Sequence, residues 1–164
     1  MKKYELTANF KIHLGKKLYQ IKALVAFGSI EAGELGGYIE KEENLDQSGD
    51  AWVSGDAWVY GDARVSGDAR VYGDARVYGD ARVYGDARVS KSTHLLQIGA
   101  IGSRNGFTTF FKSKSNNIMV SCGCFLGTIA KFEAAVTAKH AGTKHAKTYF
   151  AAIELAKLQI ELEA

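Results

Sequence analysis

The sequence predicts a mainly β protein built around a solenoid, followed by a small α/β region. Seven six-residue units run without a break from Gly49 to Ser90, and Gly, Asp, Ala and Val keep the same offsets in every unit. A fixed short period indicates a solenoid, in which each rung buries a core only by stacking on its neighbours. The chain also has no proline, which suits strand ladders and helices. After residue 90 the period stops, and patterns typical of strands and helices replace it.

Each unit reads Val-(Tyr or Ser)-Gly-Asp-Ala-Arg in most copies. Valine and alanine share one side of a short strand, and Gly-Asp turns the corner. The unit closely resembles the hexapeptide repeat of left-handed parallel β-helix proteins. That resemblance implies a triangular coil of three units and 18 residues. It covers 49–90 strongly and extends weakly back to about residue 31, where Leu35, Ile39 and Leu45 fall on inward offsets. A flattened coil of two units is the alternative.

An 18-residue coil places outward side chains in ladders at i and i+18. Trp52 then stacks with Arg70 and Arg88, and Tyr60 with Tyr78. Stacked like charges repel, so we expect Asp–Arg pairs to balance the ladders. The outward residues form either a solvated wall or a recognition and oligomer surface, since Tyr and Arg are enriched at interfaces. The interface candidates within the repeat are Tyr60, Tyr72, Tyr78, Tyr84, Arg70 and Arg76.

Residues 1–48 are expected to lead into the solenoid and cap it. Residues 17–24 alternate as a strand, and 33–40 bend into the first coil. Residues 4–90 together resemble phage- and prophage-encoded hexapeptide-repeat proteins with a Gly-Asp-Ala-x-Val repeat, which implies a mobile-element origin rather than a reaction. Seven units make a stack too short to stand alone, so capping or oligomerisation must protect its ends. The resemblance implies a homo-oligomer, with a trimer favoured.

The pattern of residues 91–164 predicts a small βββαα domain. Strands are expected at 95–98, 107–111 and 118–125. Thr128 can cap a first helix that ends at Gly142, and Thr143 can start a second. The second helix has a broad apolar stripe, widened by Leu155, Leu158 and Leu162, so we expect it to contact both its own sheet and a neighbouring subunit. Tyr149 and Ile153 are the predicted subunit contacts.

The formal charge of +3 is unevenly distributed. Residues 1–48 carry seven Lys and seven acids, 49–90 carry five Arg and seven Asp, and 91–164 carry nine bases and four acids. A basic C-terminal region is most often a solvated surface, and otherwise favours an anionic partner. The glycine-rich segment 99–106 is most simply a β-turn, although its amides could cradle a phosphate. The candidate anion contacts are Arg104, Asn105, Lys112 and Lys114.

Cys122, Cys124, His140 and His145 give a C-x-C-x15-H-x4-H spacing, and such donors suit tetrahedral zinc. The cysteine spacing is tighter than usual, and strand parity places both cysteines on a buried face. Core packing is therefore the favoured interpretation, with structural zinc or a reactive thiol as alternatives. A disulfide across one residue is strained, so we expect reduced thiols. We predict no cofactor.

Function is predicted by the same resemblance. Many hexapeptide-repeat proteins are acyltransferases that use a histidine base and an extruded loop, and related carbonic anhydrases hold zinc with three coil histidines. The repeat here contains neither histidine nor insertion. We therefore expect a non-enzymatic, phage-type accessory protein that binds a host component. It would inhibit host antiviral defence, either as a blocker of a protein or as a sponge for an anionic nucleotide signal. The alternatives are an acyltransferase-like enzyme and a virion structural protein.

The location is expected to be the cytoplasm, that of the host if a phage encodes the protein. The first residues are polar, and no segment reaches the length of a membrane span. We expect no membrane partner and no nucleic-acid partner.

Overall fold

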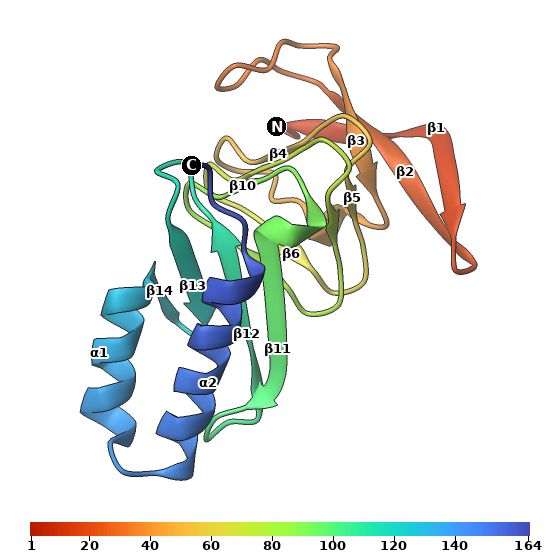
Figure 1. The fold of residues 1–164 in the computed structure, drawn as a ribbon. Coiled ribbons are helices and arrows are strands. Elements are labelled where there is room, and N and C mark those ends of the chain that lie inside the picture. The colour runs from red at the N-terminus through yellow and green to blue at the C-terminus, as the bar shows by residue number, and fades with distance from the viewer. The chain divides into compact units, whose positions relative to one another are not determined.

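A computed structural model describes residues 1–164, and the protein is mainly β with two helices. The chain divides into two compact units, Met1–Ser92 and Thr93–Ala164. The first contains the solenoid and the second an α/β layer (Figure 1). Neither helix has the length and apolar character that crossing a membrane requires.

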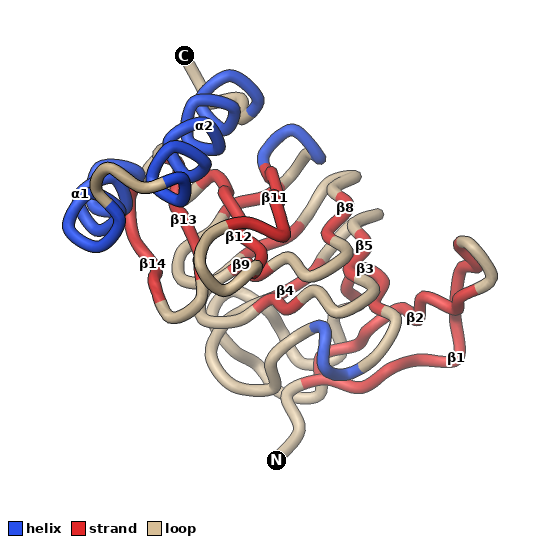
Figure 2. Tube along the Cα trace, turned by 90° about the horizontal axis from the view of Figure 1, so that it is seen from below, coloured by secondary structure: helices blue, strands red, loops and turns tan.

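The repeat folds into seven two-residue strands joined by turns. They are β4 (Trp52–Val53), β5 (Trp58–Val59), β6 (Arg64–Val65), β7 (Arg70–Val71), β8 (Arg76–Val77), β9 (Arg82–Val83) and β10 (Arg88–Val89). Each pairs in parallel with the strand three units further on, which gives the ladders β4-β7-β10, β5-β8 and β6-β9. Figure 2 shows β5 and β8 as neighbours along one side, after β3 (Leu35–Ile39). The predicted ladder of Trp52, Arg70 and Arg88 is therefore present.

The solenoid core consists of the two aliphatic positions of each unit. The Ala and Val of all seven units are at most 1% exposed. The glycine of each unit has a positive φ, as the turn requires. Neighbouring turns also come close: a Cβ built on Gly67 would lie 3.0 Å from the amide nitrogen of Gly85. The repeated glycine thus allows both the positive φ of the turn and the close approach of stacked turns.

The N-terminal segment closes one end of the solenoid. β1 (Tyr4–His13) and β2 (Lys16–Ala23) form an antiparallel hairpin, and β2 pairs with β3. Buried Lys3 donates from its Nζ to the carbonyl of Ala51 at 2.9 Å, and its Nζ lies 4.8 Å from the ring centre of Phe27. These contacts satisfy backbone groups that the first rung would otherwise expose.

The register before the repeat differs from that within it. Tyr38 lies opposite Trp58, and Leu45 lies opposite Val65. This separation is two residues longer than between rungs of the repeat, because Leu45 and Val53 lie eight residues apart instead of six. The 3-10 helix η1 (Glu42–Asn44) adds no residue to the register, since Ile39 and Leu45 keep the six-residue spacing. Ile39 and Leu45 are buried as predicted, but the prediction for Leu35 was wrong. Leu35 is 53% exposed because β3 only begins there.

The second unit is a four-stranded antiparallel sheet with two helices. After the short 3-10 helix η2 (Ser92–His94), the strands are β11 (Leu95–Ile101), β12 (Gly106–Lys112), β13 (Ile118–Cys122) and β14 (Phe125–Thr128), paired in that order. The βββαα prediction missed one strand. Gly123 has a φ of +59° and turns the chain, so the segment expected as one strand is a hairpin of two.

The helices α1 (Ile129–His140) and α2 (Lys144–Gln159) lie side by side against the sheet (Figure 1). As predicted, Thr128 caps α1 and Thr143 caps α2, each through its hydroxyl. The core between helices and sheet includes Phe110, Val120 and Phe132. Tyr149 and Ile153 belong to this core and are buried, so they face their own sheet. The prediction that they contact another subunit was wrong.

Candidate functional site

Two hollows on the solenoid unit lie along the side formed by η1, β6 and β9. One has a volume of about 400 Å³ and the other about 520 Å³, and both are lined by Glu43 and Arg64. We call them together the Arg64 groove. Its lining residues are Lys41, Glu42, Glu43, Leu45, Asp46, Gln47, Asp62, Ala63, Arg64, Val65, Ser66, Asp80, Arg82 and Tyr84.

Three arginines of the repeat bind backbone carbonyls through a shared pattern. The Nη1 of Arg76 lies 2.8 Å from the carbonyl oxygen of Asp56 and 2.7 Å from that of Asp74. Arg82 and Arg88 repeat this arrangement one and two units later. For Arg76 and Arg88 the aspartate contributes its carbonyl rather than its carboxylate, which corrects the expected Asp–Arg ion pairs. Such charge-assisted bonds tie adjacent rungs together.

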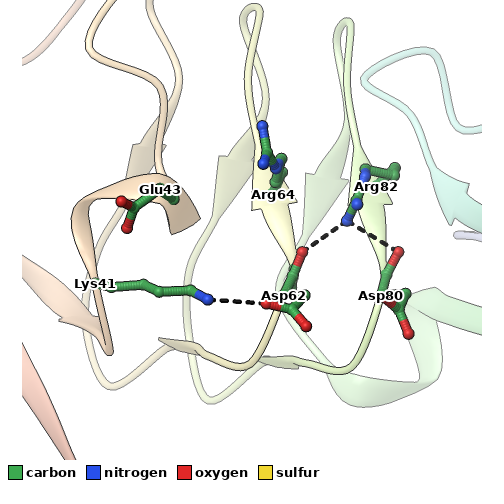
Figure 3. Close-up of a pocket in the computed structure, with 7 residues that line it drawn as sticks. Lys41, Glu43, Asp62, Arg64, Asp80 and Arg82 are labelled. Carbon is green, nitrogen blue, oxygen red and sulfur yellow. Dashed lines mark hydrogen bonds and ion pairs between the residues drawn. The ribbon is translucent and has the colours of Figure 1, made fainter.

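Arg64 does not take part in this pattern, and Figure 3 shows its side chain without a dashed contact. The carbonyl of Asp62 accepts from Arg82 Nη1 at 2.7 Å. The carbonyl of Ala63 accepts from the Nδ2 of Asn44 at 2.9 Å. The guanidinium of Arg64 makes no hydrogen bond or ion pair, and the side chain is exposed along the groove.

η1 holds Asn44 in place. The Oδ1 of Asn44 accepts from the backbone amide of Lys41 at 2.9 Å, and its Nδ2 also donates to the carbonyl of Gly61 at 3.0 Å. Asn44 is fully buried. Its side-chain polar atoms are therefore used inside the wall. Its Nδ2 binds the carbonyl of Ala63 as a backbone amide of the preceding rung does in the repeat, where the amide of Arg64 binds the carbonyl of Ala81 at 2.9 Å.

The other charges of the groove are partly paired. Lys41 Nζ lies 2.8 Å from Asp62 Oδ1, and this ion pair lowers the pKa of Asp62. The backbone amide of Ser48 lowers the pKa of Asp46. The carboxylates of Glu43 and Asp80 make no ion pair. The lining side chains comprise five acids and three bases, so the groove favours a mixed-charge ligand over a polyanion.

The predicted Tyr and Arg surface is spread over several ladders. Tyr60 stacks on Tyr78 as predicted, with ring centres 5.3 Å apart. Tyr72 follows β7 and is exposed, whereas Tyr84 follows β9 and lines the groove. The stacked pair, Tyr72 and Tyr84 therefore follow three different ladders, so the four tyrosines do not form one face.

The two predicted interface arginines are held by neighbouring groups. The guanidinium of Arg76 lies 3.8 Å from the ring centre of Trp58. Arg70 is half-buried beside the turn at Gly28, and desolvation lowers the pKa of its guanidinium.

The predicted anion contacts do not converge. Arg104 and Asn105 lie in the turn before β12, while Lys112 and Lys114 lie at and beyond its other end. A seven-residue strand spans roughly 20 Å. Lys112 is also buried and paired with Glu163. The prediction that these four residues form one anion site was wrong.

The predicted cysteine and histidine site is only partly assembled. The ring centres of His140 and His145 are 5.7 Å apart, and His140 lies 5.9 Å from the ring centre of Tyr149. The Tyr149 hydroxyl is 3.8 Å from Cys122 Sγ, and burial raises the pKa of Tyr149 to about 12. No group of three or more His, Cys, Asp or Glu side chains is placed to hold a metal. Cys124 is exposed in the β13–β14 turn, so its predicted burial was wrong.

No pattern in the sequence singles out Asn44, Glu43 or Arg64. Arg64 occupies the same repeat position as four other arginines. Only the pairing of Leu45 with Val65 shows that Asn44 lies beside it. The one available signal was that Arg64 is the first arginine of the ladder, directly after two tryptophans at the same repeat position.

Comparison with known families supports the repeat. A family model described as the YdcK beta solenoid repeat matches residues 57–73, 63–79, 69–83 and 81–97. The chain is thus similar to that repeat over 57–97, which includes β6 and β9 of the groove. A search of curated proteins returns no match.

Proposed function

We propose that the protein is a non-enzymatic binding scaffold that holds a partner protein in the Arg64 groove. The observation that carries this proposal is the unpaired guanidinium of Arg64 in a wall where Arg76, Arg82 and Arg88 are bound to carbonyls. An exposed, unpaired guanidinium suits bidentate binding of a carboxylate. The solenoid supplies rigidity, which we take to be that of the left-handed form with 18 residues per coil. The parallel pairing of Trp52 with Arg70 and of Arg70 with Arg88 supports that geometry.

A protein partner fits the groove better than a nucleotide does. Acidic side chains outnumber basic ones in the lining, and Glu43 stands beside Arg64 in both hollows. A phosphate chain would meet these carboxylates, whereas a protein segment can offer a carboxylate to Arg64 and a base to Glu43. We therefore propose that the protein inhibits host defence by blocking a host protein rather than by sequestering a nucleotide signal.

The absence of catalysis is part of the same proposal. General acid–base chemistry uses groups whose pKa lies near the working pH. Asp46 and Asp62 have their pKa lowered, which keeps both ionised. We place the action in the cytoplasm of a host cell and take the protein to be an accessory of a phage or prophage. That origin rests on the repeat resemblance alone.

Affinity capture with matched variants tests the proposal. The tagged protein, Arg64→Ala and Arg104→Ala are expressed in the host cell and captured proteins are identified. Both arginines are exposed, and Arg104 lies in the turn before β12 and does not line the Arg64 groove. We expect the unmodified chain and Arg104→Ala to capture the same specific host protein. Arg64→Ala should capture at least about tenfold less of it. Capture unaffected by Arg64→Ala, or lost with Arg104→Ala instead, contradicts the groove as the binding site.

A further inference from the structure

Two free thiols flank the glycine that turns β13 into β14. Cys122 is the last residue of β13, Gly123 has a φ of +59°, and Cys124 follows it in the turn. Cα atoms two residues apart lie at most about 7 Å from each other. Disulfides join Cα atoms that are about 4.4–6.8 Å apart, so the chain permits a link between these two thiols.

The two thiols differ in their surroundings. Cys124 is exposed, whereas Cys122 is half-buried. The Sγ of Cys122 accepts a hydrogen bond from the Thr108 hydroxyl at 3.3 Å and lies 3.8 Å from the Tyr149 hydroxyl. Oxidants react first with accessible thiols, and redox-sensing thiols are often placed next to a second thiol that resolves the first product. The exposure of the two side chains therefore assigns the first reaction to Cys124 and the second to Cys122.

We propose that Cys122 and Cys124 form a reversible redox switch that hydrogen peroxide closes. The sulfur of Cys124 attacks the peroxide: an S–O bond forms, the O–O bond breaks and water leaves, which gives a sulfenic acid. The sulfur of Cys122 then attacks the sulfur of Cys124. An S–S bond forms, the S–O bond breaks, and the hydroxyl leaves with the thiol proton of Cys122 as a second water. The two sulfurs together lose two electrons, which reduce the peroxide.

The link closes reversibly because a disulfide across a single residue is strained. Strained disulfides have high reduction potentials and are readily reduced by other thiols. The two thiols are therefore the resting form, and a dithiol reductant restores them. These properties suit a sensor rather than a structural cross-link.

Closing the link requires the β13–β14 turn to reorganise. The Cys122 side chain contacts Thr108 and Tyr149, while that of Cys124 is exposed, so the two thiols have different surroundings in the reduced form. Gly123 allows the change, because a Cβ built on it would meet nothing within 4 Å. The turn therefore has room to move.

The same movement reaches the core of the second unit. Cys122 pairs with Phe125 across the hairpin, and the ring centre of Phe125 lies 5.1 Å from that of Phe132 in α1. Oxidation should thus loosen both the hairpin and its contact with α1. The switch shares no residue with the Arg64 groove, so failure of one proposal leaves the other standing.

Oxidation of the full chain with hydrogen peroxide tests the pair. Intact-mass measurement and peptide mapping should show a Cys122–Cys124 disulfide that dithiothreitol reduces again. Cys122→Ser should stop at a sulfenic acid on Cys124, which dimedone traps. Cys124→Ser should lose its remaining thiol at least about tenfold more slowly than Cys122→Ser does, because Cys122 is half-buried.

Four results of this experiment overturn the proposal. They are a chain that peroxide leaves reduced, a disulfide between two copies, over-oxidation of Cys124 beside a free Cys122 thiol, and equal rates of thiol loss in the two serine variants.

Hydrogen exchange of the reduced and oxidised chains tests the structural change. The amides of residues 119–128 should exchange at least about tenfold faster in the oxidised form, because the hairpin opens locally more often. The amides of residues 58–83 in the repeat are the internal control and should not change. Equal exchange of the hairpin amides in the two forms contradicts a switch.

Discussion

The side-chain amide of Asn44 binds the carbonyl oxygen of Ala63 at 2.9 Å, on the wall where the arginines of the upper rungs bind carbonyls. The side chain of a buried asparagine thus takes the place that a backbone amide has one rung further on, where the amide of Arg64 binds the carbonyl of Ala81 at 2.9 Å. The neighbouring acceptor, the carbonyl of Asp62, is already bound by Arg82. The free guanidinium of Arg64 thus lies at the first arginine of the repeat, where the lead-in segment joins it.

Removing this amide should destabilise the solenoid unit. Asn44→Ala leaves the carbonyls of Gly61 and Ala63 without a side-chain donor in a buried wall. We expect a loss of about 1–3 kcal/mol in the free energy of unfolding. Urea denaturation measures it, with exposed Asn9→Ala as the control. Equal stability of the two variants would show that the amide is not structurally required.

The same substitution at two arginines should give unequal results. Arg76→Met removes bonds to the carbonyls of Asp56 and Asp74 and the contact with Trp58, so we expect a loss of about 1–3 kcal/mol. Arg64→Met removes no bond and should stay within about 0.5 kcal/mol of the unmodified protein. The midpoints of urea denaturation compare the stabilities of the two variants. A loss at Arg64 as large as that at Arg76 would mean that Arg64 is structural.

The glycines of the repeat should tolerate no side chain. Gly67 has a φ of +70°, and a Cβ there would lie 3.0 Å from the amide nitrogen of Gly85. Gly67→Ala should cost at least about 1–2 kcal/mol. Gly106→Ala serves as the control, since its φ is ordinary and its Cβ would meet nothing within 4 Å. Thermal unfolding distinguishes them, and a tolerated Gly67→Ala would contradict the close stacking of turns.

Stability at high pH should depend on Tyr4. Its buried hydroxyl lies 2.7 Å from the carbonyl oxygen of Leu45, and burial raises the pKa of Tyr4 above its ordinary value of 10.0. An acid with a raised folded pKa contributes fully below the unfolded pKa, and its contribution falls as the pH rises above it. The unfolding free energy of the unmodified protein should thus fall more steeply above pH 10 than that of Tyr4→Phe. Parallel slopes would contradict this role.

The solenoid was predictable because its pattern is local and repeated. Val and Ala at fixed offsets determine the inward side, and Gly-Asp determines the corners, so the ladder of Trp52, Arg70 and Arg88 followed directly. The β13–β14 hairpin was missed because Gly123 falls inside an apolar run that reads as one strand. A single glycine does not reveal a positive φ without the neighbouring strands.

The groove could not be predicted in the same way. Arg64 differs from Arg82 only in what lies beside it in space, and the two residues added between Leu45 and Val53 shift that neighbour from the repeat register. Likewise, the sequence showed that α2 is apolar on several sides, but it did not show that Tyr149 faces the sheet while Leu158 faces solvent.

Site-specific photo-crosslinking in the host cell tests the account most directly. A photoreactive residue replaces Glu43, which lines both hollows, and in a second variant it replaces Tyr72, an exposed tyrosine that lines neither. The account predicts a covalent adduct with one host protein from position 43, lost when Arg64→Ala is added, and no such adduct from position 72. An adduct from position 72 alone, or one from position 43 that persists with Arg64→Ala, would contradict a binding site organised by Arg64.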